Sequence, residues 1–114
     1  MRNQFLVFSS RTGDGDSTII ERAKLFRGAV RLPVMAKLNL SYGETPTVTV
    51  KLYGLRVADE TWEELASGTY TTGTPKYLHS QGKLHGFRKY KLTLSANTNV
   101  TVDTAYIGVG VMED

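Results

Sequence analysis

The chain has 114 residues, the size of a single domain, and this length excludes a second folded domain. Its 40% hydrophobic and 22% charged content is typical of a globular protein, and the lack of cysteine excludes disulfides, zinc–thiolate sites and thiol nucleophiles. The net charge of +3 is uneven, because residues 1–57 carry nine Lys or Arg against four Asp or Glu, whereas residues 58–114 carry five against seven. A surface with both signs suits contact with another protein at least as well as contact with nucleic acid, which needs one continuous basic stripe.

The N-terminal segment is short of apolar residues for a signal peptide, and no run in the chain approaches the roughly 20 residues of a membrane span. We therefore expect a soluble protein without an export signal. Residues 1–12 have two interpretations. They are either an extended arm that adds a strand to a neighbouring protein or the edge strand of the protein's own domain, which covers residues 13–114.

Residues 18–26 are ambiguous between helix and strand. Thr18 and Glu21 form a capping box, and Gly28 is placed to end a two-turn helix. The β-branched start of the segment and its short length favour a strand instead. The sequence leaves both interpretations open.

Two runs of alternating apolar and polar residues, 34–42 and 47–52, are typical of half-buried strands. The intervening residues 43–46, which include a glycine and a proline, predict a turn. We therefore expect the two runs to pair as an antiparallel hairpin.

The clearest strand is 87–95, in which Tyr90 alternates with lysine and shares its face with leucines. Residues 96–99 predict a turn before the last strands. The apolar residues at 100–102 and at 107–111 lie on opposite parities, so a bulge near Asp103 is needed if both sets face the core. Seven or eight short strands without a long helix predict an all-β fold, an antiparallel β-sandwich of the jelly-roll or immunoglobulin-like kind.

Catalytic and metal-binding patterns are missing from the sequence. There is no nucleophile elbow and no phosphate-binding loop. The two histidines, His79 and His85, do not have the spacing of a ligand pair, and the 14–17 segment lacks most ligands of a calcium loop. We expect no enzyme activity, no metal and no cofactor.

Two aromatic groups have both a binding and a structural interpretation. Trp62, Tyr70 and Tyr77 are candidates for a sugar-stacking platform, but a domain of this size favours a large aromatic side chain in its core. The basic and aromatic residues at 87–91 are candidates for single-stranded nucleic-acid binding. The alternation places Tyr90 in the core instead, so no nucleic-acid partner is expected.

Taken in order, several segments resemble a family of small all-β structural proteins of tailed bacteriophages, capsid decoration (cement) proteins among them. The segments that carry the resemblance are Gly13–Thr18, Val48–Gly54, Thr61–Leu65, Phe87–Leu92, Val100–Val102 and Tyr106–Gly108. The chain differs from the usual sequence pattern of these proteins at the basic stretch 21–24 and in the long loop 74–86, which leaves the placement of capsid contacts open.

The resemblance implies a non-enzymatic protein that binds the major capsid protein on the outside of the head, across capsomer boundaries, and stabilises the shell non-covalently. It also implies a homo-oligomer, a dimer or trimer, that is made in the cytoplasm of the host bacterium and located in the virion, with no membrane partner. Neck, tail and fibre proteins are alternative positions. The alternative function is a carbohydrate- or receptor-binding module displayed on the virion.

The candidate contact residues fall into two groups, an apolar one in the N-terminal segment and a basic one after it. They are Phe5, Val7, Phe8 and Arg11, then Arg22, Lys24, Arg27 and Arg31. We expect the first group to add a strand to a neighbour and the second to face an acidic capsid surface. In the alternative interpretation, Phe5 and Val7 fill the edge strand of their own domain.

Overall fold

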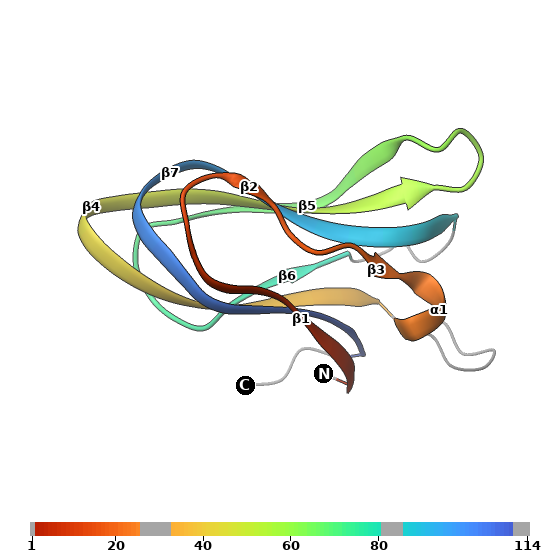
Figure 1. Ribbon diagram of the computed structural model, residues 1–114, viewed down its shortest axis with the longest axis horizontal. Coiled ribbons are helices and arrows are strands. Elements are labelled where there is room, and N and C mark those ends of the chain that lie inside the picture. The colour runs from red at the N-terminus through yellow and green to blue at the C-terminus, as the bar shows by residue number, and fades with distance from the viewer. Residues whose placement is uncertain (1, 26–32, 81–85, 111–114) are drawn as a thin grey trace.

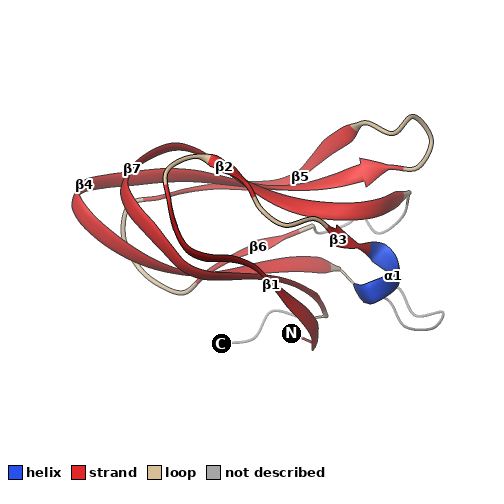
Figure 2. Cartoon of the chain, viewed as in Figure 1, coloured by secondary structure: helices blue, strands red, loops and turns tan. Residues whose placement is uncertain are grey.

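The computed structural model describes residues 2–25, 33–80 and 86–110, and the chain there consists almost entirely of β-strands (Figure 2). The elements in chain order are β1 (Arg2–Thr12), β2 (Gly15–Asp16), β3 (Ile20–Glu21), α1 (Arg22–Leu25), β4 (Val34–Arg56), β5 (Trp62–Tyr70), β6 (Lys76–His79) and β7 (Phe87–Val109). The helix α1 has four residues, and no helix in the described ranges is long and apolar enough to cross a membrane.

The strands form one antiparallel seven-stranded sheet, which is not closed within the described residues. Its main order is β1-β7-β4-β5, while β2 and β3 pair with β7, and β6 pairs with β4. Strands β4 and β7 have 23 residues each and pair with one another along almost their whole length. These two strands therefore form the spine of the molecule.

Both long strands bend at the same place, and the sheet folds back over itself there (Figure 1). The register between β4 and β7 shifts between Tyr42 and Thr47. One side of the bend, the first half-sheet, contains β1, β6, residues 34–42 of β4 and residues 100–109 of β7. The other side, the second half-sheet, contains the remaining parts of β4 and β7 with β2, β3 and β5.

The predicted hairpin between residues 34–42 and 47–52 is therefore wrong. These runs are consecutive parts of β4, and each pairs with β7 instead of with the other. Residues 96–99 also lie inside one strand, with positive φ angles of 50° at Ala96 and 56° at Asn99. Residues 43–46 and 96–99, which predicted turns, form bends inside β4 and β7 instead. The two strands bend side by side and therefore stay paired.

The core lies between the two half-sheets. Leu38 from the first and Leu52 from the second are completely buried, and Tyr90 is among the largest fully buried side chains, as its alternation predicted. The predicted bulge is confirmed, because Asn39 pairs with Thr104 whereas the next residue of β4 pairs with Val102. The extra residue between them brings both apolar sets of β7 to the core face.

Residues 18–25 contain both of the structures that the sequence left open. Ile20 pairs with Tyr90 in the short strand β3, and the chain then turns into α1. The helical turn places Leu25 in the core, where its side chain is completely buried. Residue 26 and Gly28 lie outside the described residues.

Candidate functional site

The apolar candidates of the N-terminal segment lie on β1, an edge strand of the first half-sheet. Val7 and Phe8 are buried with 5% and 6% of their surface exposed, and Phe5 packs against the core from a partly buried position. A register shift between Leu6 and Phe8 turns two successive side chains inward. These three side chains point into their own domain, as in the alternative interpretation of the sequence.

The described basic candidates lie on two different elements, Arg11 on β1 and Arg22 with Lys24 on α1. The guanidinium group of Arg11 lies 5.9 Å from the ring centroid of Phe8 and donates a hydrogen bond to the carbonyl oxygen of Asp14. Arg22 and Lys24 lie on α1, which is held beside the start of β1 by a hydrogen bond from the Asn3 side chain to the Leu25 carbonyl. The remaining candidates, Arg27 and Arg31, lie outside the described residues.

On the outer face of the second half-sheet, Lys51 and Lys91 are paired with carboxylates. Lys51 lies 3.1 Å from Glu64, and Lys91 lies 2.9 Å from Asp16. The hydrogen bond from Lys91, with a second from Thr93, holds the pKa of Asp16 below its usual value. The Glu64 carboxylate raises the pKa of Lys51.

Trp62 lies on this same outer face, so its expected place in the core is wrong. The Lys91 ammonium nitrogen is 4.4 Å from the Trp62 ring centroid and 5.9 Å from that of Tyr53. Tyr70, at the opposite end of β5, packs against the core. Tyr70 lies eight residue steps along β5 from Trp62, roughly 25 Å, so the two rings do not form the sugar-stacking platform that the sequence suggested.

The outer face of the first half-sheet differs, because one row of side chains crosses it without charge pairing. Lys37 of β4 pairs with Tyr77 of β6 and with Tyr106 of β7, and Tyr106 pairs with Leu6 of β1. Direct cross-strand partners point to the same face. The neighbours of Lys37 in β4, Ala36 and Leu38, are completely buried, so this row faces outward. We call Leu6, Tyr106, Lys37 and Tyr77 the tyrosine row.

The polar atoms of the tyrosine row have unused bonding capacity. Lys37 makes no ion pair with any residue of the described ranges, in contrast to Lys51 and Lys91 on the other face. The Tyr77 hydroxyl oxygen is buried and has no hydrogen-bond partner there. Leu6 has 50% of its surface exposed. The row therefore combines a cation, two aromatic rings and an apolar side chain on one flat surface.

The sequence does not predict the tyrosine row as a whole, although it predicts one part of it. The alternation of residues 34–42 predicted that Lys37 points outward. The order of the strands across the sheet could not be predicted, because no local feature of the sequence indicates that β6 and β7 flank β4 at this point. The row exists only after residues 6, 37, 77 and 106 are brought side by side.

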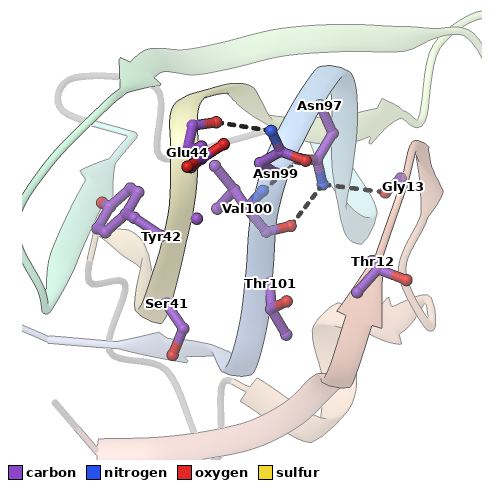
Figure 3. A pocket seen from close by; sticks show the side chains of 10 residues that line it. Thr12, Gly13, Ser41, Tyr42, Glu44, Asn97, Asn99, Val100 and Thr101 are labelled. Atoms are coloured by element: carbon purple, nitrogen blue, oxygen red, sulfur yellow. Dashed lines mark hydrogen bonds between the residues drawn. The ribbon is translucent and has the colours of Figure 1, made fainter.

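A polar hollow of about 620 Å³ lies at the bend of the sheet (Figure 3). Its lining comes from the end of β1, the bend of β4 and the bend of β7. A smaller hollow of about 410 Å³ lies beside α1 and includes Glu21, Val57 and Arg88. Among the described residues, no three His, Cys, Asp or Glu side chains are grouped to hold a metal ion.

Comparisons with known proteins identify no family for the chain. No protein-family model matches it, and no curated protein matches it. A solved structure, the tryptic core of a Bacillus thuringiensis Cry1Da variant, matches with a TM-score of 0.42 and 8% sequence identity. The match covers 98% of this chain but only 22% of that protein. A likeness this weak carries no argument about fold or function.

Proposed function

We propose that the protein is a non-enzymatic structural component of a tailed-phage virion, a capsid decoration protein that binds the outside of the head and stabilises the shell. The resemblance of its sequence segments to such proteins supports this function. The observation that carries it is the tyrosine row, an outward-facing surface in which Lys37 has no ion pair within the described residues. The partner in this proposal is an acidic patch of the major capsid protein, which supplies carboxylates to the lysine.

The chemistry of the tyrosine row suits such a contact. Tyrosine is enriched at protein interfaces because its ring buries apolar surface while its hydroxyl bonds polar groups. Leu6 adds exposed apolar area next to Tyr106. Docking gives Lys37 a carboxylate partner without breaking an ion pair to any described residue. Binding to the assembled shell in preference to free subunits would stabilise the shell by mass action.

We propose further that the two half-sheets form the layers of a β-sandwich of the jelly-roll kind. The arrangement in Figure 1, in which β4 and β7 bend and run back, supports this description. Buried leucines from both sides of the bend support it as well. In such a sandwich the two outer faces point in opposite directions, so docking by the tyrosine row leaves the Trp62 face exposed to solvent.

The first test compares matched lysine variants on the two faces. Lys37→Gln removes a charge that has no partner in the described residues, and Lys51→Gln removes one that pairs with Glu64. We expect Lys37→Gln and Tyr106→Ala to weaken binding to heads assembled without this protein by about tenfold or more, because central interface groups dominate affinity. We expect Lys51→Gln to bind like the wild type.

Binding is measured by co-sedimentation with purified heads, and thermal unfolding shows that each variant is folded. Equal binding of Lys37→Gln, Tyr106→Ala and the wild type would contradict docking by the tyrosine row. Wild-type protein that sediments with tails and not with heads would contradict the decoration function and favour a neck, tail or fibre position.

A further inference from the structure

The hollow at the bend is lined by three segments that are distant in sequence. It is lined by residues 12–13 at the end of β1, 41–44 of β4, and 97 and 99–101 of β7. Its volume of about 620 Å³ falls within the range of about 300–1,000 Å³ that is usual for small-molecule sites. Every lining residue belongs to the described part of the chain. The hollow is separate from the residues proposed to dock on the shell.

A row of hydroxyl groups forms one side of the hollow. Thr101 pairs with Thr12 on one side and with Ser41 on the other, so the three side chains stand next to one another across three strands. The Ser41 hydroxyl donates to a carboxylate oxygen of Asp103 at 2.6 Å, which leaves its lone pairs available. The threonine hydroxyls make no side-chain hydrogen bond within the described ranges. Each hydroxyl can still accept a hydrogen bond from a ligand.

The opposite side of the hollow is rigid and rich in acceptors. Asn99 donates from its amide nitrogen to the Glu44 carbonyl oxygen at 2.6 Å, which leaves its own amide oxygen without a described partner. Asn97 is held on both sides, because it accepts from the Val100 nitrogen and donates to carbonyl oxygens of Val100 and Gly13. The Glu44 carboxylate makes no ion pair within the described residues. Figure 3 shows the two asparagines and Glu44 at one end and the hydroxyl row at the other.

The chemistry of the lining excludes several classes of ligand. Glu44 is the one charged residue in the lining, so an anion is repelled. A single lining carboxylate does not provide the oxygen ligands that a calcium ion needs. The Tyr42 ring points away from the other side chains, and its hydroxyl donates to the Gly73 carbonyl, so the hollow offers no aromatic ring on which a flat ligand could stack.

We propose that this hollow binds a neutral saccharide. Sugar hydroxyls donate to carboxylate and amide oxygens and exchange hydrogen bonds with side-chain hydroxyls, which are the groups that the two sides present. Because Tyr42 is turned away, binding rests on hydrogen bonds without ring stacking. The proposal concerns a site distinct from the tyrosine row and does not depend on shell docking.

The test is an NMR titration of the ¹⁵N-labelled protein with neutral methyl glycosides of glucose, galactose, mannose and N-acetylglucosamine. We expect at least one glycoside to give saturable shifts confined to the amides at 12–13, 41–44 and 97–101. Glu44→Gln keeps the shape of the side chain and removes its charge, and Thr101→Val removes one hydroxyl. We expect each change to weaken binding by roughly tenfold. Glu21→Gln, which alters the hollow beside α1, is the matched control and should bind normally.

Thermal unfolding and the amide spectrum of each variant show whether it keeps the wild-type fold. No saturable shift with any of the four glycosides would overturn the proposal. So would shifts centred on Trp62 and Tyr53, or equal affinity in wild type, Glu44→Gln and Thr101→Val. Because head binding is measured separately, failure of the saccharide site leaves the result for the tyrosine row unaffected.

Discussion

At the scale of single residues, Lys91 illustrates how a charged side chain of the second half-sheet is paired with residues of other strands. Its ammonium group contacts the Asp16 carboxylate and the ring of Trp62, and 16% of its side chain is exposed. The alternation of β7 predicted that Lys91 points outward. Its partners could not be predicted, because Asp16 and Trp62 come from two other strands, and the adjacent glutamates at 63–64 obscure the alternation around Trp62.

The first prediction concerns the substitution Lys91→Met. Methionine keeps the length of the side chain but removes the ion pair with Asp16 and the contact of the cation with Trp62. We expect a loss of about 1 kcal/mol in the free energy of unfolding, measured by urea denaturation. Lys89→Met, which changes a lysine without a described ion pair, is the control. Equal stability of the two variants would contradict the assigned role of Lys91.

The second prediction concerns pH. Hydrogen bonds from Lys91 and Thr93 depress the pKa of Asp16 in the folded protein, so its contribution to stability is present above the unfolded pKa of about 3.9. The contribution is lost as the pH falls through the lower, folded pKa. We expect Asp16→Asn to be less stable than the wild type at neutral pH and the difference to shrink at acid pH, measured by chemical denaturation across that range. A pH-independent difference would argue against this linkage.

At the scale of elements, the central feature is that β4 and β7 bend together. The sequence indicated the strand segments 34–42, 47–52 and 87–95 and the bulge near Asp103 correctly, because these follow from alternation, but it missed β6, which lies within the expected loop 74–86. It predicted a hairpin at 43–46 and a turn at 96–99, because glycine, proline and asparagine have the same local preferences in a bend and in a turn. Only the pairing partner distinguishes the two, and that is a long-range property.

Ser17 lies beside β7 at the open side of the folded sheet and bonds to Leu92 of that strand. Its backbone N–H donates to the Leu92 carbonyl at 2.8 Å, and its hydroxyl accepts from the Leu92 N–H at 2.9 Å. The next residue, Thr18, donates to the Val7 carbonyl of β1. This short segment therefore links the second half-sheet to the first.

The third prediction concerns the substitution Ser17→Ala. The Leu92 N–H is buried, and without the serine hydroxyl it has no acceptor in this arrangement. We expect a loss of about 1–3 kcal/mol in the free energy of unfolding. Ser67→Ala, at an exposed position of β5, should change stability by less than about 0.5 kcal/mol. Thermal and urea denaturation measure both, and a neutral Ser17→Ala would show that this link contributes little.

At the scale of the whole molecule, the two half-sheets share one core but differ in their outer faces. One face carries paired charges around Trp62, and the other carries the tyrosine row, in which Lys37 has no ion pair among the residues that the structure describes. Composition predicted a surface with both signs of charge. It could not predict this asymmetry, because the assignment of each lysine to a face and to a partner depends on strand order.

The most direct test of the proposed function is the orientation of the domain on a decorated head, determined by cryo-electron microscopy. Heads incubated with the protein should show extra density on the outer surface. In that density the first half-sheet should face the shell, with Lys37 and the two tyrosines of the row in the contact. The opposite orientation, with the Trp62 face against the shell, or heads without extra density would contradict this account.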